Sequence, residues 1–261
     1  MLLYEAREFD TVFDCETSST TWRTPPTDIS LSDSAVDVWL ISLAQPSAAD
    51  GSFADVLSST ERERAARFKF DKHRRPFVVA HAALRSILSQ YLNTAPVDLP
   101  FVSGINGKPS LAPELSGSGL QFNLSHSHEM ALLGVTRGRE IGVDIEWIKE
   151  DYGFDEVAER FFTAKEVAEL RALSIHLQRQ AFFKCWTSKE AFLKAKGTGL
   201  SGKLDEVKIT LSDEQRVRIH ASVRGWTLME LSPGGSYEAA LVVEGGSLPV
   251  NCYRWQPAPA R

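Results

Sequence analysis

Two short segments of the chain carry acidic side chains at spacings that could bind a metal ion. The first is the run Ile141-Gly142-Val143-Asp144-Ile145-Glu146. If this run is a β-strand, Asp144 and Glu146 lie on one face and the aliphatic side chains on the other, because side chains alternate along a strand. Two neighbouring carboxylates raise each other's pKa, so they need a cation, a shared proton or a basic partner.

A third carboxylate follows about forty residues later, in the run Trp186-Thr187-Ser188-Lys189-Glu190-Ala191-Phe192-Leu193-Lys194. In a helix, Trp186, Glu190 and Lys194 share one face because they are four residues apart. Taken singly, each motif is more often a solvated strand face or an ordinary i,i+4 ion pair, which contributes roughly 0.2 to 0.5 kcal/mol. Together they predict a hard, oxygen-binding metal ion such as Mg²⁺ beside a cation.

Four motifs occur in a fixed order along the chain. The runs Gly107-Lys108-Pro109 and Phe122-Asn123-Leu124-Ser125-His126 precede the two acidic segments. With these motifs, residues 36–245 resemble the 4'-phosphopantetheinyl transferases of the longer, Sfp-like kind, whereas residues 1–35 lie outside the resemblance.

The resemblance implies an enzyme that transfers the 4'-phosphopantetheine group of coenzyme A to a serine of an apo acyl or peptidyl carrier protein. Adenosine 3',5'-bisphosphate would be released. Asp144, Glu146 and Glu190 are then the ligands of Mg²⁺, which also binds the pyrophosphate of coenzyme A, and the expected catalytic residues are Asp144, Glu190 and Lys194. Glu190 either takes the serine proton, directly or through water, or serves only as a metal ligand, and this choice stays open.

The same resemblance implies contacts to coenzyme A by Arg64, Arg85, Lys108, Ser125, His126, Lys189 and Lys194. Residues 61–75 contain seven Lys or Arg and three acids. Such a run is by default a solvated helix face, but the family places cations for the 3'-phosphate here. Arg64 is the closest positional match and Arg85 the second, although the family's lysines are not reproduced. Lys189 lies about 100° round the helix from Glu190.

Composition sets limits on the compartment and the partners. With 261 residues, 43% of them hydrophobic, the chain can bury the core of one large or two small domains. A net charge of -5 argues against a protein devoted to nucleic acid. No apolar run reaches the roughly 18 residues of a membrane span and no signal peptide opens the chain, so a cytoplasmic protein without a membrane partner is expected.

The three cysteines have no C-x-x-C spacing and predict neither a disulfide framework nor a zinc site. Cys185 lies among aromatic residues and is expected in the core.

Longer members of the family tend to be monomers, so a monomer is expected here.

Residue patterns predict an α+β protein. Strands are expected at 36–43, 97–103, 110–111, 120–124, 130–136, 140–147, 206–211, 216–223, 227–231 and 238–243. Helices are expected at 60–70, 75–93, 155–161, a stretch after Thr163 and 177–196. Thr60 with Glu63, and Thr163 with Glu166, match the capping-box pattern at helix starts. The pair Asn106-Gly107 is a hairpin turn signal.

The predicted organisation is an N-terminal extension, 1–35, an N-terminal α/β half, 36–139, and a C-terminal α/β half, 140–261. The resemblance implies that the two halves have similar folds and pack about a pseudo-two-fold axis with the active site between them. Carrier contacts are expected within 149–162. Two alternatives remain, a carboxylate-metal phosphohydrolase or nuclease, which would need an activated water, and a binding module without activity.

Overall fold

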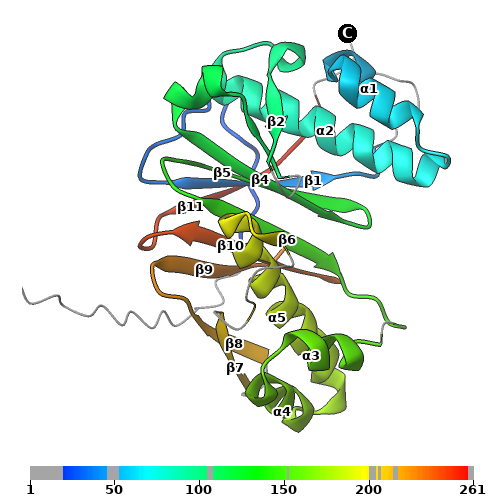
Figure 1. Ribbon diagram of the computed structural model, residues 1–261, viewed down its shortest axis with the longest axis vertical. Helices are drawn as coiled ribbons and strands as arrows, with labels where there is room; N and C mark the ends of the chain where they lie inside the picture. The colour runs from blue at the N-terminus through cyan, green and yellow to red at the C-terminus, as the bar shows by residue number, and fades with distance from the viewer. Residues whose placement is uncertain are drawn as a thin grey trace, which may run out of the picture.

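A computed structural model describes residues 20–45, 53–104, 108–151, 153–199, 204, 207–213 and 217–257. Cys15 and the predicted Asn106-Gly107 turn lie outside these ranges. The described chain forms two halves, each with a 22-residue helix packed on a β-sheet, as Figure 1 shows. The predicted α+β class is confirmed.

The first half is built on a four-stranded sheet with the order β11-β1-β5-β4. Its strands are β1 (Val36–Ser42), β4 (Leu120–Ser127), β5 (Met130–Arg137) and β11 (Val250–Arg254). The helices α1 (Ser59–Ala66) and α2 (Asp71–Leu92) lie beside it, and the apolar face of α2 packs on β1, β4 and β5. A two-stranded sheet, β2 (Phe101–Ser103) with β3 (Pro109–Leu111), and short 3-10 helices at Ala54–Val56, Pro96–Asp98 and Pro113–Ser118 complete this half.

The second half is built on an antiparallel sheet with the order β6-β10-β9. Its strands are β6 (Ile141–Trp147), β9 (Trp226–Leu231) and β10 (Tyr237–Glu244). The long helix α5 (Ile175–Lys196) packs on this sheet, and a second layer comprises α3 (Asp155–Phe161), α4 (Ala164–Ala172), β7 (Lys208–Asp213) and β8 (Val217–Ser222). Cys185 is fully buried in this core, as expected.

A third core cluster joins the two sheets. Ile141, Val143 and Ile145 of β6 are fully buried there against the first sheet. The opposite face of β6 meets α5, because a Cβ on Gly142 would come within 2.0 Å of the carbonyl oxygen of Ala191. The predicted alternation along this strand is therefore confirmed.

The start of α1 differs from the prediction by two residues. Ser58, and not Thr60, caps the helix, and Glu61 completes the capping box by bonding the backbone of Ser58. Both Ser58-x-x-Glu61 and Thr60-x-x-Glu63 fit the pattern. Glu61 prevails because it also meets His81 and Arg85 of α2, which a local pattern does not reveal.

The strand β11 was not expected. It pairs parallel with β1, with Val38 opposite Cys252, so the end of the chain returns to the sheet of the first half. The predicted boundary at residue 140 places this strand with the second half. Before β1, Arg23 forms an isolated parallel bridge with Tyr253, so this residue of the extension lies beside β11.

The described helices include none that combines the length and the apolar character needed to cross a lipid bilayer.

Candidate active site

β4 and β6 meet at the junction of the halves through a row of polar side chains, which we call the polar seam. Three side chains of β4 at alternate positions reach β6, because alternate side chains of a strand share a face. The bonds are Val143 N–H to Asn123 Oδ1 at 2.9 Å, Ser125 Oγ to Asp144 Oδ1 at 2.8 Å, and Ser127 Oγ to Glu146 Oε2 at 2.7 Å. The seam thus brings residues of the first half to the acids of the second.

Lys194 of α5 completes a triangle at the centre of the polar seam. Its Nζ lies 2.5 Å from Asp144 Oδ1 and 2.8 Å from Ser125 Oγ. Ser125 is buried, and its hydroxyl accepts from the lysine while it donates to the aspartate. The structure therefore brings together Ser125, Asp144 and Lys194, three residues that the sequence pointed to.

Two carboxylate oxygens beside this triangle are buried without a hydrogen-bond partner among the described residues, Asp144 Oδ2 and Glu190 Oε1. Burial raises the pKa of Asp144, and the charge of Lys194 only partly opposes this. Burial and the negative charge of Asp144 raise the pKa of Glu190, and the same two causes raise that of Glu146. The three acids thus form one cluster of mutually repelling charges.

The oxygen ligands of the cluster suit a divalent cation, although the three carboxylates do not converge on one position. Within the described ranges, no group of three or more His, Cys, Asp or Glu side chains stands ready to hold a metal ion. The two oxygens nevertheless call for a cation or a proton, because a buried and unpaired carboxylate oxygen is costly. Hard carboxylate oxygens suit Mg²⁺.

Backbone geometry fixes the two elements that carry these acids. Gly142 allows α5 to lie directly on β6, since a Cβ there would meet Ala191 O at 2.0 Å and Ala195 N at 2.4 Å. The helix ends as predicted, with Gly197 in the left-handed conformation at φ +67°. Glu190 and Lys194 are therefore held in the last two turns of α5, close to Asp144.

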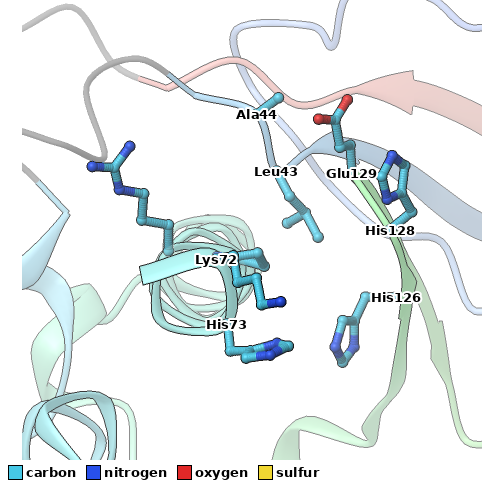
Figure 2. A pocket seen from close by; sticks show the side chains of 9 residues that line it. Leu43, Ala44, Lys72, His73, His126, His128 and Glu129 are labelled. Carbon is cyan, nitrogen blue, oxygen red and sulfur yellow. The ribbon is translucent and has the colours of Figure 1, made fainter. Parts of the chain in front are cut away.

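A pocket of about 550 Å³ opens beside His126, between the start of α2 and the hairpin of β4 and β5. Its lining residues are Leu43, Ala44, Lys72, His73, Arg75, Pro76, His126, His128 and Glu129. Figure 2 shows Lys72 and His73 on one side of the pocket and His126 on the other. Partial desolvation, together with the charges of Lys194 and His81, lowers the pKa of His126.

Two residues that were predicted to contact coenzyme A, Lys189 and Arg85, are buried inside the protein instead. The Lys189 side chain is fully buried, where Nζ lies 3.0 Å from Glu166 Oε1 and donates to the carbonyl oxygens of Leu204 and Val207. The Arg85 guanidinium is also buried and bonds Glu61. These contacts argue against both predictions, because each cation already has protein partners.

Of the other cations predicted to contact coenzyme A, Lys108 is half-buried and Arg64 is exposed. Lys108 Nζ donates to the carbonyl oxygens of Ile141 and Lys194, so it ties the first half to the end of α5. Arg64 is exposed and lies 5.1 Å from the ring centroid of Phe77, but it does not line the pocket.

The sequence interpretation missed several residues that the structure places at the site. Ser127, which bonds Glu146, could have been found from the alternation Asn123, Ser125, Ser127. Lys72 and His73 stood within the basic run, but no spacing distinguished them from its solvated members.

Two protein-family models match the chain. Residues 140–242 match "4'-phosphopantetheinyl transferase superfamily" and residues 45–137 match "4'-phosphopantetheinyl transferase, N-terminal". A curated relative, "4'-phosphopantetheinyl transferase HetI" of Nostoc sp., is 38% identical over 237 residues, which cover 91% of this chain and 96% of the relative. The chain belongs to the 4'-phosphopantetheinyl transferase superfamily.

Other relatives of this 4'-phosphopantetheinyl transferase are more distant. "4'-phosphopantetheinyl transferase Sfp" of Bacillus subtilis is 32% identical over 169 residues, or 64% of this chain and 72% of the relative. The solved Thermotoga maritima holo-[acyl-carrier-protein] synthase (AcpS) superposes with a TM-score of 0.31 and 21% identity, over 41% of this chain and 64% of that chain. The predicted resemblance is confirmed, and the family transfers the phosphopantetheine group to carrier proteins.

Proposed function

We propose that this enzyme transfers 4'-phosphopantetheine from coenzyme A to a serine hydroxyl of an apo acyl or peptidyl carrier protein in a Mg²⁺-dependent reaction. The serine oxygen forms a bond to the phosphorus that carries the pantetheine arm. The bond from this phosphorus to the bridging oxygen breaks, and adenosine 3',5'-bisphosphate leaves with that oxygen. The observation that carries the proposal is the pair of buried oxygens, Asp144 Oδ2 and Glu190 Oε1, which have no hydrogen-bond partner among the described residues and lie beside Lys194.

Asp144, Glu146 and Glu190 would hold the Mg²⁺ ion, which supplies positive charge for the diphosphate. Most of the catalysis in such a transfer is positioning and neutralisation of charge on the bridging and leaving oxygens. Lys194 lies beside the acids and is expected to contact a phosphate. His126 and the cations of the pocket, Lys72 and Arg75, would bind the nucleotide part of coenzyme A.

The serine proton needs an acceptor, and Glu190 is the candidate. Burial and the charge of Asp144 raise its pKa, which makes its carboxylate a stronger base. Coordination to a metal ion would weaken it as a base, so the roles of ligand and base compete. Family membership favours this transferase over the phosphohydrolase or nuclease alternative.

The test is an incubation of the protein with coenzyme A, Mg²⁺ and several unrelated apo carrier proteins, followed by intact-mass measurement. We expect one carrier or more to gain a single phosphopantetheine unit. The gain should be absent with EDTA, with an Asp144→Ala variant that keeps its cooperative melting, and with a carrier whose acceptor serine is alanine. Unchanged masses across the carriers would refute the proposal.

A further inference from the structure

The hydroxyl group of Ser127 bonds one of the acids and the backbone of the residue that follows this acid. Its Oγ donates to Glu146 Oε2 at 2.7 Å and accepts the N–H of Trp147 at 3.1 Å. With its donor and one acceptor position in use, the hydroxyl has a single favoured orientation. Ser127 thus fixes the side chain of Glu146 relative to the backbone of its own strand.

The hairpin that carries Ser127 is itself held against the second half. The ring of His128 stacks on Trp147 with the centroids 4.4 Å apart and the planes at 19°. His128 has a positive φ of 53°, which turns the chain sharply after Ser127. The next residue, Glu129, donates its N–H to the hydroxyl of Tyr237 in β10 at 3.3 Å. The serine therefore acts from an anchored turn.

Glu146 needs such an anchor because it stands beside another acid. Repulsion favours a rotation of its side chain away from Asp144, towards water. The bond from Ser127 opposes this rotation and occupies only Oε2, so that it leaves Oε1 available to a cation. Ser125 acts on Asp144 in the same way, but it also contacts Lys194.

We propose that Ser127 is a positioning residue that holds Glu146 in the orientation needed to bind the divalent cation. The proposal rests on the proposed function, since it requires that the acids bind a cation. Ser127 isolates the effect better than Ser125, because its only side-chain partner among the described residues is the acid itself. Groups that orient a metal ligand through a hydrogen bond typically change metal affinity by about 10- to 100-fold when removed.

The experiment measures Mn²⁺ binding by electron paramagnetic resonance, with coenzyme A present and no carrier protein. The wild-type protein is compared with Ser127→Ala, with the conservative variant Ser127→Thr, and with Ser89→Ala. Ser89 is a matched control, because it is also half-buried and its hydroxyl donates to a protein acceptor, the carbonyl oxygen of Ser86, within α2. Melting temperatures are recorded for all four proteins.

We expect Ser127→Ala to weaken Mn²⁺ binding about 10-fold or more, Ser127→Thr to restore most of it, and Ser89→Ala to bind like the wild type. Equal binding by wild type and Ser127→Ala would overturn this inference alone. Weaker binding that follows a lower melting temperature and is not restored by threonine would overturn it too, because it would indicate a loosened fold. If the wild type itself binds no Mn²⁺, the metal site of the proposed function fails and the inference with it.

Discussion

Lys194 Nζ lies 2.5 Å from Asp144 Oδ1, whereas Asp144 Oδ2 has no hydrogen-bond partner in the described part of the chain. The lysine thus neutralises one oxygen of this buried carboxylate and leaves the other open to the cation that we propose. The lysine alone does not balance the cluster, because Glu146 and Glu190 add two further negative charges beside it.

Neutralising one acid should stabilise the metal-free protein. The raised pKa values of Asp144, Glu146 and Glu190 mean that the folded protein binds protons more tightly than the unfolded chain. Stability should therefore fall as the pH rises from about 4 through these raised values. We expect Glu190→Gln to melt about 2 to 4 °C higher than wild type at pH 7 in EDTA, with no such gain in Glu114→Gln, an exposed acid. A lower melting temperature for Glu190→Gln would contradict this account.

A divalent cation should make the wild type melt at a higher temperature than Glu190→Gln. Because a ligand that binds only the folded state stabilises it by mass action, Mg²⁺ with coenzyme A should raise the melting temperature of the wild type. Glu190→Gln should show a much smaller rise, since it lacks one proposed ligand. Thermal melting over a range of Mg²⁺ concentrations measures both, and equal rises in the two proteins would exclude Glu190 as a ligand.

The contact between β6 and α5 should tolerate no side chain at Gly142. Alanine would place its Cβ against backbone atoms of Ala191 and Ala195, which can move only if the helix moves. We expect Gly142→Ala to lower the free energy of unfolding by about 3 kcal/mol or more. Gly117→Ala is the control, because a Cβ there would meet nothing within 4 Å. Urea denaturation that gives similar values for both variants would disprove the close packing.

Arg85 should prove structural when it is replaced. Although burial raises the pKa of Glu61, hydrogen bonds from His81 and Arg85 lower it to about 2. This acid therefore stabilises the fold above its unfolded pKa, and the effect is lost as the pH falls from about 4.5 to about 2. We expect Arg85→Met to lose about 3 to 5 kcal/mol of stability at pH 7. Its apparent KM for coenzyme A should change little, whereas a large rise in KM without loss of stability would restore the sequence prediction.

The cations of the pocket should affect the binding of coenzyme A more than turnover. Replacing Lys72 by alanine removes a charge from the lining, so we expect the apparent KM for coenzyme A to rise about 3- to 10-fold with kcat nearly unchanged. Arg67→Ala is the control, because Arg67 is exposed and pairs with Glu63.

Comparison of coenzyme A with dephospho-coenzyme A, which lacks the 3'-phosphate, tests which residue binds this phosphate. If Arg64 binds the 3'-phosphate, Arg64→Ala should raise the apparent KM for coenzyme A but hardly that for dephospho-coenzyme A. Equal effects on both donors would remove this assignment.

Local patterns predicted the parts of the site that lie within one element. Alternation along β6 gave the face of Asp144 and Glu146, and the helical period gave the shared face of Glu190 and Lys194. These predictions succeed because strand and helix geometry depend on neighbours in the sequence. The capping box of α4 at Thr163 and Glu166 is confirmed for the same reason.

Contacts between distant residues were not predictable from such patterns. Arg85 and Lys189 each pair with an acid more than twenty positions away, Glu61 and Glu166, so their charges alone suggested a phosphate contact. The five-residue strand β11 has its partner, β1, at the other end of the chain. Its sequence is too short to distinguish it from a loop.

The parallel pair of β11 with β1 gives the polypeptide two crossings between its halves, one from β5 to β6 and one from β10 to β11. The two connections join the halves covalently at separate points. Because β11 covers one side of β1, a fragment ending at residue 139 would expose the bare edge of β1. Such an edge pairs readily with other chains, and this fragment should aggregate unless residues 250–254 are supplied.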